Sequence, residues 1–148
     1  MTVRLENLYV ASDHAGFELK ELLKIAAPDL PWRDLGPIDA SSVDYPDFAN
    51  KVAEKLRGGD ANALGVLICG SGQGMAIRAN KYGHIRAALC VTEEMAELAR
   101  AHNNANVLCL GARLVPKDLA AKILAKFLKT NFEGGRHERR VAKLSEKC

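Results

Sequence analysis

The stretch Leu64-Gly65-Val66-Leu67-Ile68-Cys69-Gly70-Ser71-Gly72-Gln73-Gly74-Met75 decides how the rest of this chain is organised. Its first half is a short apolar run stopped by glycine, which predicts a buried strand. Three alternating glycines then allow a sharp turn whose backbone N–H groups no side chain covers. A helix is expected over residues 75–81, so these N–H groups lie at its positive end. We therefore expect the loop to hold an anion, or an oxygen that becomes one.

Cys69 is the last residue of the predicted strand, directly before this loop. A cysteine beside a helix end tends toward a reactive thiolate. The alternative is a small buried apolar side chain, which is the commoner role of a lone cysteine at the end of a strand. The Gly-x-Gly-x-Gly spacing differs from the dinucleotide fingerprint, and no Gly-Lys-Ser/Thr follows. A nicotinamide site is therefore not favoured, and a P-loop is excluded.

The length, composition and net charge of the chain are those of one ordinary globular domain. The chain has 148 residues, 48% of them hydrophobic and 26% charged, with a formal net charge of +3. No apolar run approaches a membrane span, residues 1–6 lack the apolar core of a signal peptide, and the modest charge does not indicate nucleic-acid binding. The four cysteines form no CxxC or Cys/His cluster. This usage predicts a reducing cytoplasm, with neither disulfides nor a zinc site.

Outward from the central loop, short apolar runs alternate with helical patterns. Besides the central strand, strands are expected at residues 8–11, 32–35, 86–91 and 106–110. Helices are expected at residues 17–26, 44–57, 93–101, from 116 onwards and at 136–147, with Asp44 and Thr92 as caps. This alternation predicts an α/β fold, a three-layer Rossmann-like sandwich with a five-stranded parallel sheet. Residues 1–148 are expected to form one domain, with 133–148 as a C-terminal helical arm.

Four polar clusters follow strand ends or close a returning helix. They are Asp13-His14, residues 69–74, His102-Asn103 and Arg113. Ligands of open parallel sheets bind beyond the carboxyl ends of the strands, so we expect these clusters to gather at one edge. A thiol, an anion-holding loop, histidines and arginines suit chemistry on a small phosphorylated molecule.

The tail supplies two further arginine candidates, and each cluster has a plainer interpretation. Arg136 and Arg140 are four residues apart and share one helix face, which could equally be a solvated basic face or a nucleic-acid patch. His102 could simply bond the last carbonyls of its helix. Asp13 and His14 could form a loop that caps the following helix.

Taken together, these motifs resemble the type B ribose-5-phosphate isomerases, a family shared with the galactose-6-phosphate isomerases. Each segment alone is weakly specific, but they occur in family order and span nearly the whole chain. The matching segments are Ser12-Asp13-His14-Ala15-Gly16-Phe17, Asp44-Tyr45-Pro46, Ile68-Cys69-Gly70-Ser71-Gly72-Gln73-Gly74, Ala79-Asn80-Lys81, Ile85-Arg86-Ala87, residues 102–108, Gly111-Ala112-Arg113 and Glu133-Gly134-Gly135-Arg136-His137.

The resemblance implies aldose–ketose isomerisation of ribose 5-phosphate and ribulose 5-phosphate through a cis-enediolate, with no metal or cofactor. Cys69 would be the general base, and Ser71 would help hold the enediolate oxygens. His102 would assist opening of the furanose ring, with Asp13 binding near the ring oxygen. The implied substrate-binding residues are His14, Tyr45, Gly70, Gly72, Gly74, Asn103, Arg113, Arg136 and Arg140, of which the histidine and the arginines hold the phosphate.

Two further expectations follow from the resemblance. Some family members carry a glutamate base just after the last loop glycine; here that residue is Met75, so this chain resembles the cysteine-dependent branch. The family also places its site at a subunit interface. We therefore expect a homodimer or a dimer of dimers, in which His102 serves Cys69 of a partner and the 133–148 arm docks on that partner.

Two other functions stay open on the sequence. The same chemistry on a six-carbon sugar phosphate, such as allose or galactose 6-phosphate, would differ in where the arginines hold the phosphate. A binding module could use the glycine loop for a nucleotide and the tail for nucleic acid. The tail lacks interleaved aromatic residues, which argues against nucleic acid. The expected partners are a sugar phosphate and a second copy of the chain, with no nucleic acid and no membrane.

Overall fold

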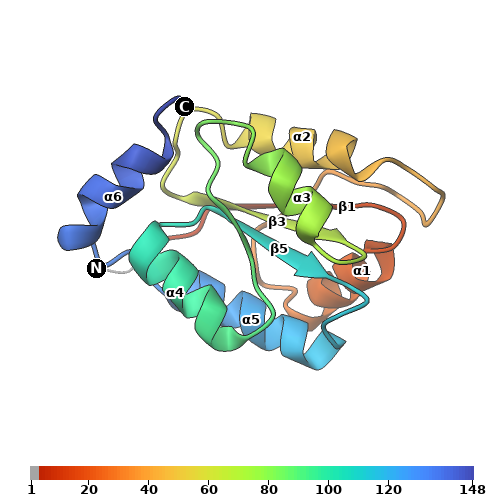
Figure 1. Cartoon of the computed structure of the whole chain (residues 1–148). Coiled ribbons are helices and arrows are strands. Elements are labelled where there is room, and N and C mark those ends of the chain that lie inside the picture. The colour runs from red at the N-terminus through yellow and green to blue at the C-terminus, as the bar shows by residue number, and fades with distance from the viewer. Residues whose placement is uncertain (1–3) are drawn as a thin grey trace.

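The computed structural model describes residues 4–148, and in this part of the chain five strands alternate with helices (Figure 1). The strands are β1 (Asn7–Ser12), β2 (Trp32–Asp34), β3 (Ala63–Cys69), β4 (Ala87–Leu89) and β5 (Val107–Gly111). The helices are α1 (Phe17–Ala26), α2 (Tyr45–Lys55), α3 (Gln73–Ala79), α4 (Glu93–Asn103), α5 (Lys117–Lys129) and α6 (Arg136–Leu144).

The strands form one sheet in the order β2-β1-β3-β5-β4, with every neighbouring pair parallel. The predicted five-stranded parallel sheet is therefore confirmed. The central strand β3 is buried at all seven positions, which explains its unbroken apolar sequence. Because the strands are parallel, each connecting helix must return antiparallel to them, and this direction decides which loops meet at each edge.

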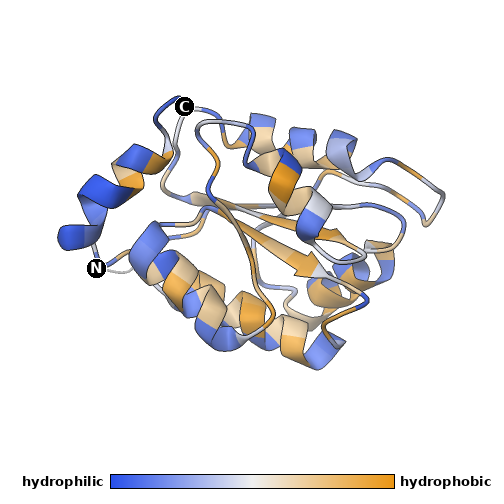
Figure 2. Ribbon diagram, in the orientation of Figure 1, coloured by the Kyte–Doolittle hydropathy of each residue, from blue (hydrophilic) through white to orange (hydrophobic). Residues whose placement is uncertain are grey.

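Helices cover both faces of the sheet, as predicted. Apolar residues of α1, α4 and α5 pack against one face, and those of α2 and α3 pack against the other. Figure 2 shows the strands as mostly hydrophobic, whereas the helices are hydrophobic only along part of their surface. Helix α6 lies apart from the sheet beside α4 (Figure 1) and is hydrophilic over most of its length. No helix within residues 4–148 is both long and apolar enough to cross a membrane.

Local expectations were met to different degrees. Helix α1 has the predicted bounds, and the Thr92 hydroxyl accepts a hydrogen bond from the Met95 N–H at 3.0 Å as a cap of α4. Asp44 occupies the N-cap position of α2, as expected, but its side chain makes no capping hydrogen bond. Helix α3 begins two residues earlier than predicted, because the turn is completed at Gly72. Strand β4 is only three residues long, since it pairs on one side alone.

Candidate active site

The glycine loop after β3 holds the thiol of Cys69 at the carboxyl edge of the sheet. Gly72 has a left-handed φ of 78°, which only glycine adopts at little cost, and this turn brings its N–H back toward the strand end. The Gly72 N–H donates to Cys69 Sγ at 3.2 Å. Cys69 is 5% exposed. The glycine loop therefore contacts the sulfur of the cysteine itself.

A cavity of about 390 Å³ opens beside this thiol. It collects residues from the ends of β1, β3 and β5 and from the start of α2. Its lining residues are Asp13, Tyr45, Cys69, Gly70, Ser71, Gly74, Arg113 and Leu114. Seven of these were predicted from the sequence, and they come together within one chain.

Asp13 is held firmly at the floor of the site. Its backbone N–H donates to the Ile68 carbonyl at 3.1 Å, which ties the end of β1 to β3. One of its carboxylate oxygens accepts from the Gly16 N–H at 3.0 Å, at the start of α1. This bond holds the turn before α1, but α1 itself has no side-chain capping hydrogen bond, so the plainer interpretation of Asp13 as a helix cap was wrong. Asp13 lines the cavity while being only 6% exposed, so its carboxylate is available to a polar ligand.

Tyr45 and Arg113 form two walls of the site because each side chain packs directly against a glycine of the loop. A Cβ atom at Gly74 would lie 2.4 Å from Cε1 of Tyr45, so the ring lies directly on this glycine. A Cβ atom at Gly70 would lie 3.0 Å from Nη1 of Arg113. The Arg113 N–H also donates to the Gly70 carbonyl at 3.0 Å. The missing side chains at residues 70 and 74 therefore let Tyr45 and Arg113 close around the thiol.

His14 and Ser71 occupy the margins of this site. The exposed His14 ring accepts a hydrogen bond at Nδ1 from the Val43 N–H at 3.3 Å, which anchors the loop before α2. His14 does not line the cavity itself. The Ser71 hydroxyl accepts from the Gln73 N–H at 3.3 Å and faces the cavity.

His102 and Asn103 lie at the opposite, amino edge of the sheet. The expectation that they gather with Cys69 was wrong for a single chain, because α4 runs antiparallel to the strands and ends just before β5 begins. Arg136 and Arg140 belong to α6, which packs beside α4 at this same end (Figure 1). Four of the predicted site residues are therefore separated from the other nine.

At the amino edge, His102 joins a small cluster with two residues of the arm. Its ring stacks on that of His137, with centroids 4.4 Å apart and planes 15° from parallel. The Nε2 atoms of His102 and His137 lie 3.7 and 4.0 Å from the two carboxylate oxygens of Glu133. His102 makes no hydrogen bond to a helix carbonyl within the described residues. Burial of the ring lowers the pKa of His137, and the charges of His102 and Arg136 lower it further.

This cluster is also where a metal ion could find ligands. One ligand atom from each of His102, Glu133 and His137 lies within 4.8 Å of the others. The two rings, however, stack nearly parallel on each other, and Arg136 adds positive charge nearby. The arrangement fits two imidazoles sharing one carboxylate better than it fits a cation site.

Sequence reasoning missed two of these residues. Leu114 lines the cavity and is 59% exposed, and its place directly after Arg113 at the end of β5 was the available signal. Glu133 had been quoted within a motif but given no role. Its backbone N–H donates to the Ala101 carbonyl at 3.0 Å, so it fixes the arm to α4.

Comparison with known proteins places this geometry in a family. The model of a family described as ribose/galactose isomerase matches residues 8–144. A probable ribose-5-phosphate isomerase B of Mycoplasma genitalium is 48% identical over 142 residues, 93% of each chain. The ribose-5-phosphate isomerase B of Escherichia coli is 38% identical over 139 residues, again 93% of each.

Solved structures agree with these relatives in fold and in sequence. A ribose 5-phosphate isomerase from Thermotoga maritima superposes with a TM-score of 0.90 at 49% identity, covering 94% of this chain and 97% of the other. The Mycoplasma genitalium ribose-5-phosphate isomerase B with bound ribulose-5-phosphate gives 0.88 at 46% identity, covering 94% and 93%. The chain therefore belongs to the ribose/galactose isomerase family, as its motifs predict.

Proposed function

We propose that this isomerase interconverts ribose 5-phosphate and ribulose 5-phosphate through a cis-enediolate, with Cys69 as the general base and no metal or cofactor. The observation that carries the proposal is the cavity in which the Cys69 thiol lies beside the glycine loop, Asp13 and Arg113. The related Mycoplasma genitalium structure, named for this activity and holding ribulose-5-phosphate, supports the choice of substrate.

The chemistry needs one proton moved between neighbouring carbons. The Cys69 thiolate takes the proton from C2 of the open-chain aldose, and the C1–C2 bond becomes the enediolate double bond. The proton of the C2 hydroxyl passes to O1, so that the C2 oxygen becomes the ketose carbonyl as the same thiol returns its proton to C1. The Gly72 N–H lies 3.2 Å from the sulfur that carries out this transfer. The Ser71 hydroxyl and the N–H groups of the loop stabilise the enediolate oxygens as negative charge develops on them.

Binding and ring opening draw on residues from both edges of the sheet. Arg113 holds the phosphate from the carboxyl edge, with His14 beside it, and Asp13 and Tyr45 contact the sugar. His102 opens the furanose ring and Asn103 contacts the sugar. Arg136 and Arg140 complete the phosphate site.

We propose that a partner subunit supplies this second set. A homodimer, or a dimer of dimers, would place the amino edge of one subunit against the carboxyl edge of the other, with the 133–148 arm docked on the partner. The separation of the two sets within one chain supports this arrangement, as do the exposed side chains of Met95, Leu98 and Leu144 on α4 and α6.

Subunit mixing tests the shared site. Cys69→Ala and His102→Ala proteins should each be weakly active on ribose 5-phosphate, and mixing after partial denaturation should restore about a quarter of the wild-type activity. Half of the random dimers are then mixed, and each mixed dimer holds one intact site. Mixtures that stay as inactive as their components, or a fully active monomer in sedimentation, would contradict the proposal.

The reaction itself is tested with chelator-treated protein on ribose 5-phosphate. We expect activity in the wild type and in a Cys148→Ser control, and its loss in Cys69→Ala. The competing proposal, a six-carbon sugar phosphate, is decided by giving the same three proteins allose 6-phosphate and galactose 6-phosphate. Activity that survives in Cys69→Ala would show that another group is the base.

The free, buried Cys90 and Cys109 support a reducing, cytoplasmic location.

A further inference from the structure

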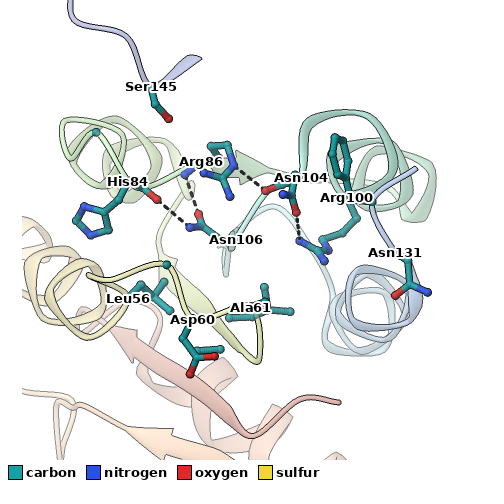
Figure 3. Close-up of a pocket in the computed structure, with 15 residues that line it drawn as sticks. Leu56, Asp60, Ala61, His84, Arg86, Arg100, Asn104, Asn106, Asn131 and Ser145 are labelled. Carbon is teal, nitrogen blue, oxygen red and sulfur yellow. Dashed lines mark hydrogen bonds between the residues drawn. The ribbon is translucent and has the colours of Figure 1, made fainter. Parts of the chain in front are cut away.

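A second and larger cavity, of about 690 Å³, lies at the amino edge of the sheet (Figure 3). It is bounded by the starts of β3 and β5, by the residues before β4 and by the end of α4. Its polar lining residues include Asp60, His84, Arg86, Arg100, Asn104 and Asn106. None of the residues proposed for the isomerase reaction lines it.

Two arginines from different elements converge in this cavity on one residue. The Arg86 Nε donates to the Asn104 carbonyl at 2.8 Å. The Arg100 Nη1 donates to the Asn104 side-chain oxygen at 3.3 Å and also to the Ala105 carbonyl. Figure 3 shows the two side chains approaching Asn104 from opposite sides. Asn104 has a left-handed φ of 47° and lies in the turn between α4 and β5. The hydrogen bonds from Arg86 and Arg100 therefore hold this turn in place.

Neither guanidinium has a negatively charged partner. Within residues 4–148, no carboxylate forms an ion pair with Arg86 or Arg100. Arg100 is only 8% exposed, and Arg86 is partly buried. Asp60, on the far wall, has an oxygen that accepts from the Asn62 N–H at 2.8 Å, and Figure 3 shows its carboxylate directed away from both arginines.

Turn stabilisation alone accounts for only part of this arrangement. The carbonyls at the end of α4 accept from the Nε of Arg86 and the Nη1 of Arg100, and the Thr130 carbonyl accepts from the Nε of Arg100 at 3.2 Å, but none of these acceptors carries a negative charge. Neither terminal nitrogen of Arg86 has a hydrogen bond within the described chain. Burial lowers the pKa of both side chains, and the charge of Arg86 lowers that of Arg100 further. A buried arginine such as Arg100 is normally paired with an anion.

The other walls suit a small polar ligand. Asn106 is held by the Arg86 N–H and the His84 carbonyl at 2.7 and 2.9 Å, so it is a fixed wall of the cavity. The cavity has room for a tetrahedral oxyanion and the group it carries. A planar guanidinium with two unbonded terminal nitrogens, as in Arg86, matches two oxygens of a phosphate.

We propose that this cavity is a second anion site, in which Arg86 and Arg100 bind a phosphate group. The site is distinct from the isomerase site, since none of the residues proposed for the isomerase reaction lines this cavity. Inorganic phosphate is the simplest ligand of this class. A phosphate monoester would place its phosphate between the arginines and its remaining atoms toward Asn106.

Calorimetric titration with inorganic phosphate tests the site against the isomerase site. The wild type and the Arg113→Gln protein should both bind phosphate at the amino edge, whereas Arg86→Gln should lose about tenfold or more in the affinity of this binding step. Arg57→Gln is the matched control, because Arg57 is exposed, pairs with Glu54 and lies outside the cavity. Arg86→Lys keeps the positive charge but loses the paired N–H donors of the guanidinium. It should bind phosphate with an affinity between those of the wild type and Arg86→Gln.

The outcomes separate the proposal from general charge effects. Selective loss in Arg86→Gln, with Arg57→Gln unchanged, supports the site. Phosphate binding that is the same in Arg86→Gln as in the wild type overturns it, as does an equal loss in Arg86→Gln and Arg57→Gln. If Arg86→Gln fails to fold, unaltered binding by the Arg86→Lys protein overturns the proposal in the same way. Ribose 5-phosphate, titrated into Arg113→Gln, then shows whether a sugar phosphate uses the site.

Discussion

Replacing Gly74 with alanine tests whether the ring of Tyr45 must lie against the glycine loop for the isomerase to work. A Cβ atom at this position would lie 2.4 Å from Cε1 and 2.6 Å from Cζ of Tyr45. Ordinary Cβ contacts begin at 3.4 Å, so the ring has to retreat by about 1 Å. Tyr45 is 40% exposed and can move outward without opening the core. Alanine also favours the helix by up to about 1 kcal/mol, so overall stability should be kept.

The cost should therefore fall on the reaction. A displacement of about 1 Å in a group that positions substrate can reduce the rate about 100-fold. We expect kcat/KM for ribose 5-phosphate to fall by about ten- to 100-fold, equivalent to about 1.4–2.8 kcal/mol of transition-state stabilisation. The thermal midpoint of unfolding, measured on the same samples, should change little.

Two further proteins make this test specific. Gly83→Ala is the matched control, because a Cβ atom there would have no neighbour within 4 Å, and it should leave kcat/KM unchanged. In a Tyr45→Ala background, Gly74→Ala should cost nothing more, since the ring that it displaces is gone. A folded Gly74→Ala protein with wild-type kcat/KM refutes the reasoning. So does an additive loss in the double variant.

Three other outcomes are expected. Burial opposes ionisation of Asp34, but hydrogen bonds from Lys20 and Lys24 outweigh this effect and hold its pKa below the usual range. The stability that this ionised carboxylate contributes at neutral pH should therefore be lost as the pH falls below about 4. In denaturant titrations, the free energy of unfolding of Asp34→Asn should depend less on pH over this range than that of the wild type. Thr92→Ala should destabilise the fold by about 1 kcal/mol in urea unfolding, since it removes the cap of α4; an unchanged midpoint would mean that the cap contributes nothing. Iodoacetamide near pH 8 should modify Cys69 and Cys148 but not Cys90, because burial raises the pKa of Cys90 to about 11. Peptide mapping should show that a sugar phosphate protects Cys69 from this modification. Equal labelling of all three cysteines, with no protection of Cys69, would contradict the proposed site.

The elements that the sequence predicted well are those whose signals are local. Helix α1 begins at an apolar periodic residue and ends before two prolines, and both bounds were predicted. Strand β3 is apolar throughout because it is central and buried on both faces. The errors lie where distant partners decide. Strand β4 is shortened because it pairs only with β5, and no feature of residues 86–91 carries that information.

The candidate site divides in the same way. Residues at or just after the end of a strand, such as Asp13, Cys69 and Arg113, reach the expected edge because the strand fixes their position. Leu114 reaches it too, but an exposed leucine after a strand has no distinguishing chemistry. His102 was expected at that edge although it ends a helix that returns to the other one. Family motifs identify the residues of a site without saying which subunit supplies them.

The two edges of the sheet also limit how the proposed reaction can be assembled. Strand β3 has seven residues and so is about 20 Å long, and Cys69 and His102 lie toward opposite ends of the sheet. No loop movement closes a distance of that order within a packed α/β core, because both residues are held by regular elements. If His102 opens the sugar ring, it must therefore do so for another subunit. Activity on ribose 5-phosphate should then fall on dilution as dimers dissociate. In a His102→Ala protein, activity on ribulose 5-phosphate, which has no furanose ring to open, should fall less than activity on ribose 5-phosphate.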